Sequence, residues 1–542
     1  MASSRGVPDS PPGKDPVRLR RALGLGQLTA SGIGLIIGAG IYVLLGAATD
    51  VAGVGVWAGF LVAGICSALT ALSYAELAAM YPTAGAEYEY TRRVAAPSVA
   101  FLVGWVMIAG LIVAAAAVAL GFATYVRSFV DVPVELAAMA LLAGVSVVAL
   151  RGIERSAAIT VALSLIQVGG LVAIIAIGVP HLGDHSLVQG LSVDGVVGGA
   201  ALVFFAFIGF DEVITLAEET AEPTRTVPRA LLFALGISTL LYVGVAIAGI
   251  SVLGPRVLAG SDQPLADIAR TAIGATGADV VAVVALVATT NTTLLCITAA
   301  SRLQYGMTST AALPEWLGVL NRHRVPWRAV GLAAVISAGF VLVGDITLVA
   351  SVTDVAVYLV FIAVNATVIA LRVRQPHRRR PFRVPCSIGP VPLPAIAGIG
   401  TVAVLLPSLD LTAIATGVGL CLVGLVAYAL VRSRGAGTGN VQGSADDGMR
   451  RTKVTIDDAH RVATELRIDF AAVEFDVAEL QHGMEMELQH GRADPDTNVT
   501  NDDLVVTAKI ALAHLHEIPD YYARLAEMED AARQEWSRRR GG

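Results

Sequence analysis

Residues Gly32–Tyr42 read GIGLIIGAGIY, a run with four glycines inside an apolar stretch that extends from residue 25 to residue 46. A membrane-spanning helix is normally continuous, and so many glycines weaken it. Gly34 and Gly38 alone would fit the small-residue spacing of closely packed helices. The crowding of Gly32, Gly34, Gly38 and Gly40 favours a second interpretation, in which the helix unwinds near the middle of the bilayer.

The composition of the whole chain is that of a membrane protein. Its 542 residues are 55% hydrophobic and 15% charged, with a mean hydropathy of +0.69, far from the averages of soluble domains. A helix needs about 20 apolar residues to cross a bilayer. We therefore predict an all-α membrane protein with twelve transmembrane helices, over residues 25–46, 53–80, 98–126, 134–150, 157–180, 196–217, 229–253, 278–301, 329–344, 349–371, 390–408 and 411–431.

The positions of Lys and Arg predict the orientation of these helices. Cytoplasmic loops close to the membrane collect positive charge. With both termini cytoplasmic, Arg127, Arg256 and Arg270 are the only basic residues of the membrane part on the outer side. Residues 1–22 lack the apolar core and cleavage site of a signal peptide and predict a cytosolic lead. We expect a multi-pass protein of the plasma membrane.

A second apolar stretch is interrupted at Phe204–Val213, which reads FFAFIGFDEV. It lies in the sixth predicted helix, five helices after the glycine run. Transporters built from two inverted repeats of five helices have discontinuous helices at these two corresponding positions. The spacing therefore predicts a 5+5 inverted repeat in which the first and sixth helices are broken.

Unwound backbone inside a membrane predicts a binding site, because its free polar groups are tolerated only where they line a cavity or meet a ligand. We expect the amides of Ala39 and Gly40, at the positive end of a half-helix, to bind a carboxylate. The carbonyls of Ile36, Phe204 and Ala206 would accept hydrogen bonds from an ammonium group. This pair of sites fits an α-amino acid better than a sugar or a metal ion.

Several side chains near these stretches are candidates for function. Phe207 is either an aromatic gate over the substrate or a packing side chain, and the sequence does not decide between them. Asp211 lies within the sixth predicted helix, where a carboxylate is expensive and usually functional. Glu76 and Asp354 lie near the ends of predicted helices and either have a functional role or reach the membrane interface, of which we favour the second.

Four motifs in order carry a family resemblance. They are GIGLIIGAGIY, then Ala71–Arg93 (ALSYAELAAMYPTAGAEYEYTRR), Phe204–Ala230 (FFAFIGFDEVITLAEETAEPTRTVPRA) and Ala288–Met307 (ATTNTTLLCITAASRLQYGM) with Leu313 and Pro314. Residues 20–432 thus resemble the amino acid-polyamine-organocation (APC) transporters, which share the fold of bacterial leucine transporters. The FAF-I-GFD form is similar to the cationic amino acid transporter branch, whose members also carry small neutral amino acids.

The resemblance implies how the substrate is held and points to one departure from the family. It implies that backbone at Ile37–Gly40 holds the carboxylate and backbone at Phe204–Ile208 the amine. Proton-coupled bacterial relatives carry a lysine in the fifth helix that replaces a sodium ion, whereas this chain has Gln167. A glutamine does not titrate, so we expect no lysine-type proton switch. Its amide would instead hydrogen-bond a carbonyl of the first helix.

The coupling ion is left open by the sequence. Thr292 and Thr293 offer hydroxyls near the sodium site of the relatives. These hydroxyls do not clearly supply a sodium site, so we predict exchange, facilitated uptake or proton coupling through another acid.

The composition changes at Ser433, where SRGAGTGNVQGSADDG begins a flexible linker. We predict a lead over 1–22, a transporter domain over 23–432, a linker over 433–449 and a small helical cytosolic domain over 450–542. HGMEMELQHG (His482–Gly491) and the stretch Thr497–Glu529 resemble a small bacterial domain of unknown function, which brings no activity with it.

Two pairs in this tail are weak candidates for metal binding, because residues three apart share a helix face. They are Glu487 with His490 and His514 with Glu517. Solvated faces rich in Glu and His produce such pairs by chance, so we predict no metal and no cofactor.

The sequence therefore predicts a secondary amino acid transporter that works by alternating access. Its partners are an amino acid, with H⁺ or Na⁺ as a candidate co-substrate, and membrane lipid, without nucleic acid. No GxxxxGK[ST] loop or catalytic constellation indicates an ATPase or another enzyme. The alternative is an amino acid sensor that signals through the C-terminal domain.

Overall fold

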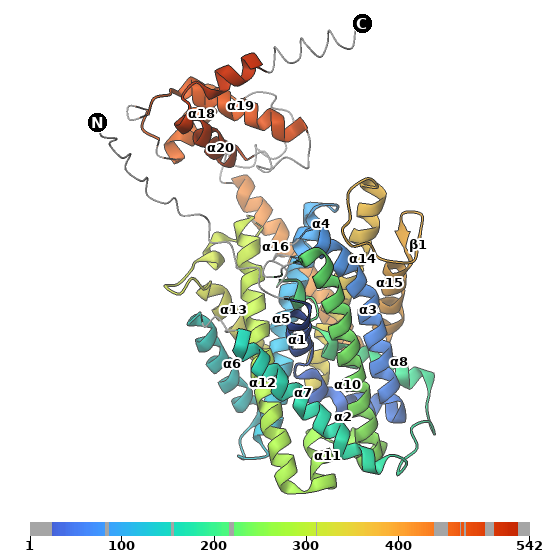
Figure 1. Ribbon diagram of the computed structural model, residues 1–542. Coiled ribbons are helices and arrows are strands. Elements are labelled where there is room, and N and C mark those ends of the chain that lie inside the picture. Colours follow the sequence, from blue (N-terminus) through green and yellow to red (C-terminus); the bar gives the residue numbers. More distant parts are fainter. Residues whose placement is uncertain are drawn as a thin grey trace, which may run out of the picture. The chain divides into compact units, whose positions relative to one another are not determined.

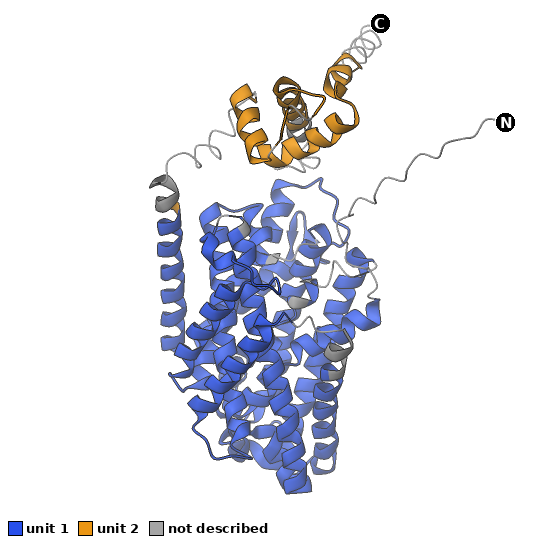
Figure 2. Ribbon diagram, turned by 90° about the vertical axis from the view of Figure 1, so that its left-hand side faces the viewer, with its two compact units in different colours: residues 1–431 blue, residues 432–542 orange. Residues whose placement is uncertain are grey.

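The computed structural model describes residues 24–81, 86–152, 157–215, 220, 222–310, 312–437, 454–466, 468–470, 473–493 and 503–528. The chain divides into two compact units, residues 1–431 and residues 432–542, which Figure 2 distinguishes by colour. The first unit is a large helical bundle, and the second is built from short helices.

The first half of the bundle contains nine α-helices and three short 3₁₀ helices among the described residues. In chain order they are α1 (Leu25–Ile36), α2 (Gly40–Ala52), η1 (Gly53–Gly55), α3 (Val56–Met80), α4 (Ala86–Arg92), α5 (Pro97–Val126), α6 (Val134–Leu150), α7 (Ala157–Gly178), η2 (Val179–His181), α8 (Val193–Val203), η3 (Phe204–Phe207) and α9 (Glu212–Thr215).

The second half adds longer helices and one small hairpin. Its elements are α10 (Pro223–Ala259), α11 (Pro264–Ile273), α12 (Ala275–Ser309), η5 (Glu315–Gly318), α13 (Trp327–Val341), α14 (Ile346–Arg374), β1 (Ser387–Ile388), β2 (Val391–Pro392), α15 (Leu393–Leu405), η6 (Leu406–Ser408) and α16 (Leu411–Gly437). The strands β1 and β2 pair antiparallel, with Ser387 opposite Pro392.

Many of these helices suit a membrane. Within the described residues, seven helical stretches are long and apolar enough to cross a bilayer, and five shorter apolar helices accompany them. One of the seven stretches, Gly40–Met80, contains both α2 and α3. The helices therefore agree with a multi-pass membrane protein, and the number of crossings stays a prediction.

The helix α5 is the centre of the bundle (Figure 1). It packs against α6, α12, α13 and α14, and most of its residues are buried. Its alanine run Ala114–Ala117 lets neighbouring helices approach closely, as small residues do in membrane bundles. A second contact layer is formed by α3, which packs against α8, α10 and α15.

Among the interruptions of regular helix in the described residues, two lie close together in the bundle. Between the end of α1 at Ile36 and the start of α2 at Gly40, three residues are not helical. After α8 the chain continues as η3 to Phe207, and α-helix resumes only at Glu212. We call residues 36–40, that is the three non-helical residues and the helix residue on either side of them, the first gap, and residues 204–211 the second gap. Contacts of α2 with α8 and η3 bring the two gaps together.

The glycine run serves both close helix packing and the interruption of the helix, of which the sequence interpretation favoured only the interruption. Gly32 and Gly34 lie inside α1 and do not mark the interruption. A β-carbon on Gly34 would lie 1.6 Å from the Oγ of Ser164 in α7, and one on Gly32 would lie 3.0 Å from the Cβ of Ala234 in α10. These two glycines therefore permit close helix packing, whereas Gly38 lies in the first gap.

The second unit has a core of its own. Its helices are α18 (Ile456–Glu465), α19 (Val477–Ala493) and α20 (Leu504–Glu517). Thr455 and Asp458 form a capping box at the start of α18, and Asp503 caps α20. The core joins apolar side chains of all three helices, among them Val462, Leu480, Met484, Ala511 and Leu515.

Candidate functional site

The first gap forms a tight turn of the main chain. Ile37 has φ −74° and ψ 75°, outside the helical region. The amide of Gly38 donates to the carbonyl of Ile36 at 2.7 Å. The amide of Ala39 donates to the Oγ1 of Thr292 in α12 at 3.2 Å. Two backbone donors that an isolated gap would leave free are thus bonded within the protein.

The second gap contains an extended residue followed by a left-handed glycine. Ile208 has φ −61° and ψ 137°, and Gly209 has φ +109°, a conformation that favours glycine. The amide of Gly209 donates to Asp211 Oδ1 at 3.2 Å. Asp211 is buried, and through this hydrogen bond its carboxyl group caps the backbone of the second gap.

The two gaps touch each other through residues without bulk. A β-carbon on Gly40 would lie 2.5 Å from the Cα of Ala206 and 2.7 Å from its Cβ. A β-carbon on Gly38 would lie 2.8 Å from the Oγ1 of Thr292. Glycine is therefore required at Gly40 by the approach of the second gap rather than by an unusual backbone angle.

One tyrosine hydroxyl lies between the carbonyls of both gaps. Tyr242 of α10 places its hydroxyl 2.8 Å from the oxygen of Ile36 and 2.9 Å from the oxygen of Ala206. These are two of the carbonyls for which the sequence predicted an ammonium partner. The hydroxyl has one hydrogen and so donates to one carbonyl at a time. Sequence reasoning missed Tyr242, because a tyrosine in an apolar helix carries no distinguishing local pattern.

Aromatic rings enclose the second gap. Phe207 is fully buried and meets the ring of Tyr242 edge-on, with centroids 5.2 Å apart. Phe204 packs on Tyr358 of α14 at 4.7 Å and on Phe361 at 5.4 Å. The structure thus packs Phe207 edge-on against the tyrosine whose hydroxyl meets carbonyls of both gaps.

Among the predicted coupling residues, Gln167 makes different contacts from those expected. Gln167 is buried in α7, and its backbone carbonyl accepts a hydrogen bond from the Tyr42 hydroxyl at 3.1 Å. Neither polar atom of its side-chain amide has a partner among the described residues. The expected bond from this amide to a carbonyl of the first helix is therefore wrong for this conformation.

The two threonines of α12 differ in their contacts. Thr292 donates to the carbonyl of Ala288 at 3.0 Å while it accepts from the amide of Ala39. Thr293 donates to the carbonyl of Thr289 at 2.9 Å and is buried. Only Thr292 therefore contacts the first gap directly.

Comparison with known proteins assigns most of the chain to one family. Residues 23–431 match the family model described as amino acid permease. An uncharacterized transporter of Mycobacterium tuberculosis is 32% identical over 422 residues, which cover 77% of this chain and 92% of the relative. The chain belongs to the amino acid permease family. The resemblance to the APC superfamily is thereby confirmed, and the permease is an integral membrane protein of a family of transporters, not enzymes.

Relatives of the permease are named for different substrates. A branched-chain amino acid permease of Bacillus subtilis is 29% identical over 438 residues, covering 76% of this chain and 93% of the relative. Cationic amino acid transporter 4 of Arabidopsis thaliana, a vacuolar protein, is 28% identical over 347 residues, covering 58% and 56%. Both names refer to amino acids, but to amino acids with different side chains, branched-chain in one and cationic in the other.

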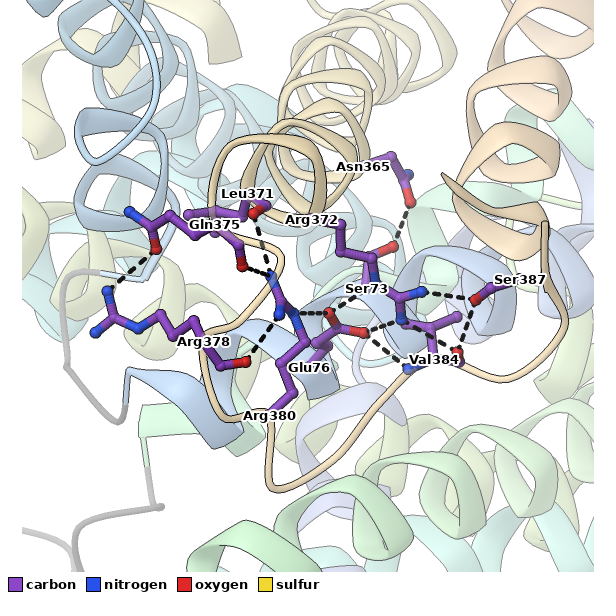
Figure 3. A network of polar contacts seen from close by, with 10 residues as sticks. All are labelled: Ser73, Glu76, Asn365, Leu371, Arg372, Gln375, Arg378, Arg380, Val384 and Ser387. Carbon is purple, nitrogen blue, oxygen red and sulfur yellow. Dashed lines mark hydrogen bonds and ion pairs between the residues drawn. The ribbon is translucent and has the colours of Figure 1, made fainter. Parts of the chain in front are cut away.

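A network of buried polar and charged side chains joins α3, α14 and the segment that follows α14 (Figure 3). Glu76 of α3 is 1% exposed and pairs with Arg372 of α14, whose Nε lies 2.9 Å from Glu76 Oε1. Arg380 lies 3.2 Å from the same oxygen, and the amide of Val384 donates to Glu76 Oε2 at 2.8 Å. The expectation that Glu76 reaches the membrane interface is therefore wrong.

This network fastens the segment after α14 to α3. Arg372 also donates to the Oγ of Ser387, the first residue of β1, at 2.6 Å. Further along α14, Asn365 Oδ1 accepts from Ser73 at 2.7 Å and its amide donates to Thr70 at 3.0 Å. The two helices are thus held together by polar contacts along their shared face.

A second buried acid of the permease, Glu87 of α4, lies near Asp211 of the second gap. The carboxyl of Glu87 accepts from the hydroxyl of Tyr74 at 3.1 Å and is buried. Burial and, after it, the negative charge of nearby Asp211 raise the pKa of Glu87 to about 7. Glu87 therefore changes its charge near neutral pH. The sequence alone does not reveal this, because the contact depends on how the chain folds.

In the tail, residues 459–531 match the model described as a protein of unknown function (DUF5661). The Nε2 of His514 lies 3.8 Å from Glu487 Oε1, which also accepts from the Tyr522 hydroxyl at 2.8 Å. The structure thus brings Glu487 of α19 close to His514 of α20. Glu517 is exposed, and the side chain of His490 lies outside the described residues. No group of three or more metal-ligating side chains occurs in the described part of the chain.

Proposed function

We propose that this protein is a secondary transporter that moves amino acids across the plasma membrane by alternating access. In this proposal the bundle has twelve transmembrane helices arranged as a 5+5 inverted repeat, and the first and sixth helices are discontinuous at the two gaps. Membership of the amino acid permease family supports the substrate class. The meeting of two helix interruptions inside a buried bundle supports the mechanism, because such interruptions hold substrates in transporters of this architecture.

The main chain of the two gaps holds the substrate in this proposal. Backbone at Ile37–Gly40 binds the carboxylate, and carbonyls at Phe204–Ile208 together with Ile36 bind the amine. The observation that carries it is the Tyr242 hydroxyl within 2.9 Å of the Ala206 carbonyl and 2.8 Å of the Ile36 carbonyl. Two carbonyls from different gaps converge on one hydrogen-bond donor, and an ammonium group offers three donors at the same place.

We infer that the structure represents a closed arrangement of the site, and the bonded amide of Ala39 supports this inference. The amide of Ala39 is bonded to Thr292, and the rings of Phe207 and Tyr242 are buried. In the cycle that we propose, the Thr292 hydroxyl holds the first gap when no substrate is present. A substrate carboxylate then takes over this amide, and Phe207 moves with the second gap.

The domain layout follows the same proposal. Residues 23–432 form the transport domain with both termini cytoplasmic, residues 433–449 form a linker, and residues 450–542 form a separate cytosolic domain. The apolar core of the second unit supports independent folding of that domain. Transport then does not require it, whereas an amino acid sensor would need it for output.

Counterflow in proteoliposomes tests the function. Purified protein is reconstituted with a mixture of the twenty amino acids inside, and uptake of the same mixture in labelled form is followed. We expect saturable uptake that is absent from empty liposomes, and equal uptake by a variant that lacks residues 440–542. Absence of counterflow contradicts the proposal. Binding without counterflow by the full chain favours the sensor.

A further inference from the structure

Asp354 is a buried acid that none of the contacts described above uses. Its side chain is 0% exposed, and neither carboxylate oxygen has a hydrogen-bond partner among the described residues. The sequence placed it near the end of a helix with access to the interface. In the structure α14 begins at Ile346, more than two turns earlier. Asp354 is fully buried within the bundle, so the expected access of its side chain to the interface is wrong.

Asp354 belongs to one stripe of α14. Asp354, Tyr358, Phe361 and Asn365 are spaced by four, three and four residues, which places them on one face of the helix. Asn365 at the end of this stripe is bonded to α3, as described above. Asp354 is the only member of the stripe that carries an ionisable carboxyl group.

This stripe packs against the second gap and the helix that leads into it. The hydroxyl of Tyr358 donates to the carbonyl of Ala201 in α8 at 3.1 Å. The ring of Tyr358 packs on Phe204, and Phe361 meets Phe210 with centroids 5.3 Å apart. A change in the position of the second gap therefore changes the surroundings of the stripe on which Asp354 lies.

No cation among the described residues faces Asp354. Of the elements packed against α14, α5, α15 and η3 carry no charged side chain. The charged residues of the others are Glu76 of α3, Asp194 of α8, and Glu87, Glu89 and Arg92 of α4. Glu76 is paired with Arg372 far along α14, and Asp194 is exposed. The titratable group that faces Asp354 on its own helix is the Tyr358 hydroxyl, which carries no positive charge.

An ionised carboxylate in this position would have neither water nor a partner to offset its charge, and such burial is very costly. We propose that Asp354 is a proton-binding site whose proton is exchanged during the transport cycle. The proton adds to a carboxylate oxygen in the closed arrangement seen here. It leaves to water when movement of the second gap opens the face of α14, so that proton binding and the closed state stabilise each other.

This inference rests on the proposed function and names the co-substrate that the sequence left open. The variant D354N keeps the size of the side chain and removes the proton site. Full-length protein in proteoliposomes is assayed with the labelled mixture of twenty amino acids in two ways. Counterflow at equal pH needs no net proton movement, whereas accumulation against a gradient is driven by an imposed pH difference in sodium-free buffer.

We expect wild type to accumulate the label under the pH difference and to perform counterflow. We expect D354N to keep counterflow and to lose accumulation. The control D50N changes an exposed acid of α2 and should retain both activities. Accumulation by D354N equal to that of wild type overturns the proposal, as does wild-type accumulation that follows a sodium gradient and not the pH difference.

Infrared spectroscopy of purified protein gives an answer that does not depend on transport. Wild type should show the carbonyl band of a protonated carboxylic acid, and the conservative variant D354E should shift that band. Absence of any such shift overturns the proton site even if counterflow succeeds. A shift together with absent counterflow supports the proton site and contradicts the proposed transport function, so the two failures are distinguishable.

Discussion

The substitution G40A places a methyl group where the two gaps touch. Its β-carbon would lie 2.5 Å from the Cα of Ala206, whereas ordinary contact begins at 3.4 Å. Relief of this overlap requires the gaps to separate by about 1 Å. Overpacking of this kind costs about 1–3 kcal/mol, and that free energy corresponds to about 5–150-fold in an equilibrium constant. We therefore expect G40A to bind amino acids about 5–150-fold more weakly than wild type.

Competition binding with purified protein measures this effect. A labelled amino acid bound by wild type is displaced with increasing unlabelled ligand, and the Kd of G40A is compared with that of G144A. Gly144 of α6 is exposed, and a β-carbon there meets nothing within 4 Å, so G144A should bind as wild type does. Both variants should elute as single species in size-exclusion chromatography. A wild-type Kd for a well-folded G40A would refute the assignment of the site to the contact between the gaps.

Three further variants test other contacts of the structure. Y242F removes the hydrogen-bond donor that the carbonyls of Ile36 and Ala206 share. An unsatisfied buried acceptor costs about 1–3 kcal/mol, so the melting temperature of this variant in detergent should fall. An unchanged melting temperature would contradict the role of Tyr242 as a bridge. Glu87 has its pKa raised from 4.5 to about 7, so the folded state binds more protons than the unfolded state between these values, and its contribution to stability declines as the pH rises through this window. In E87Q this decline should be absent from melting curves taken from pH 5 to pH 8, whereas E89Q, on the same helix, should keep it. E76Q leaves buried arginines without their partner and should lower the free energy of unfolding by about 3–5 kcal/mol; a melting temperature equal to that of E89Q would show that the network adds no stability.

The two stretches singled out in the sequence lie next to helix ends of the structure, and the sequence signal for them is local. Glycines within GIGLIIGAGIY and the FFAFIGFDEV stretch coincide with the end of α1 at Ile36 and the end of α8 at Val203. Local sequence does not separate the two uses of glycine, since unwinding and close packing both require a missing side chain. For this reason Gly32 and Gly34 were assigned to the interruption although they lie in α1.

Contacts between distant parts of the chain were not predictable in the same way. The Tyr242 hydroxyl meets a carbonyl 206 residues away in the chain, and Arg372 meets Glu76 across 296 residues. Hydropathy gives the length of a helix but not the depth or direction of a side chain. It therefore placed Glu76 and Asp354 at the interface, whereas the packing of α14 buries both acids.

The account depends on main-chain groups that hold both ends of an amino acid. Equilibrium binding of the twenty labelled amino acids to purified protein, with methyl esters and N-acetyl derivatives as competitors, tests this most directly. At least one free amino acid should bind saturably, and its two derivatives should compete at least about tenfold more weakly, because each loses a charge-assisted hydrogen bond worth about 1.5–3 kcal/mol. No saturable binding of any amino acid, or derivatives that compete as well as the parent, would contradict the account.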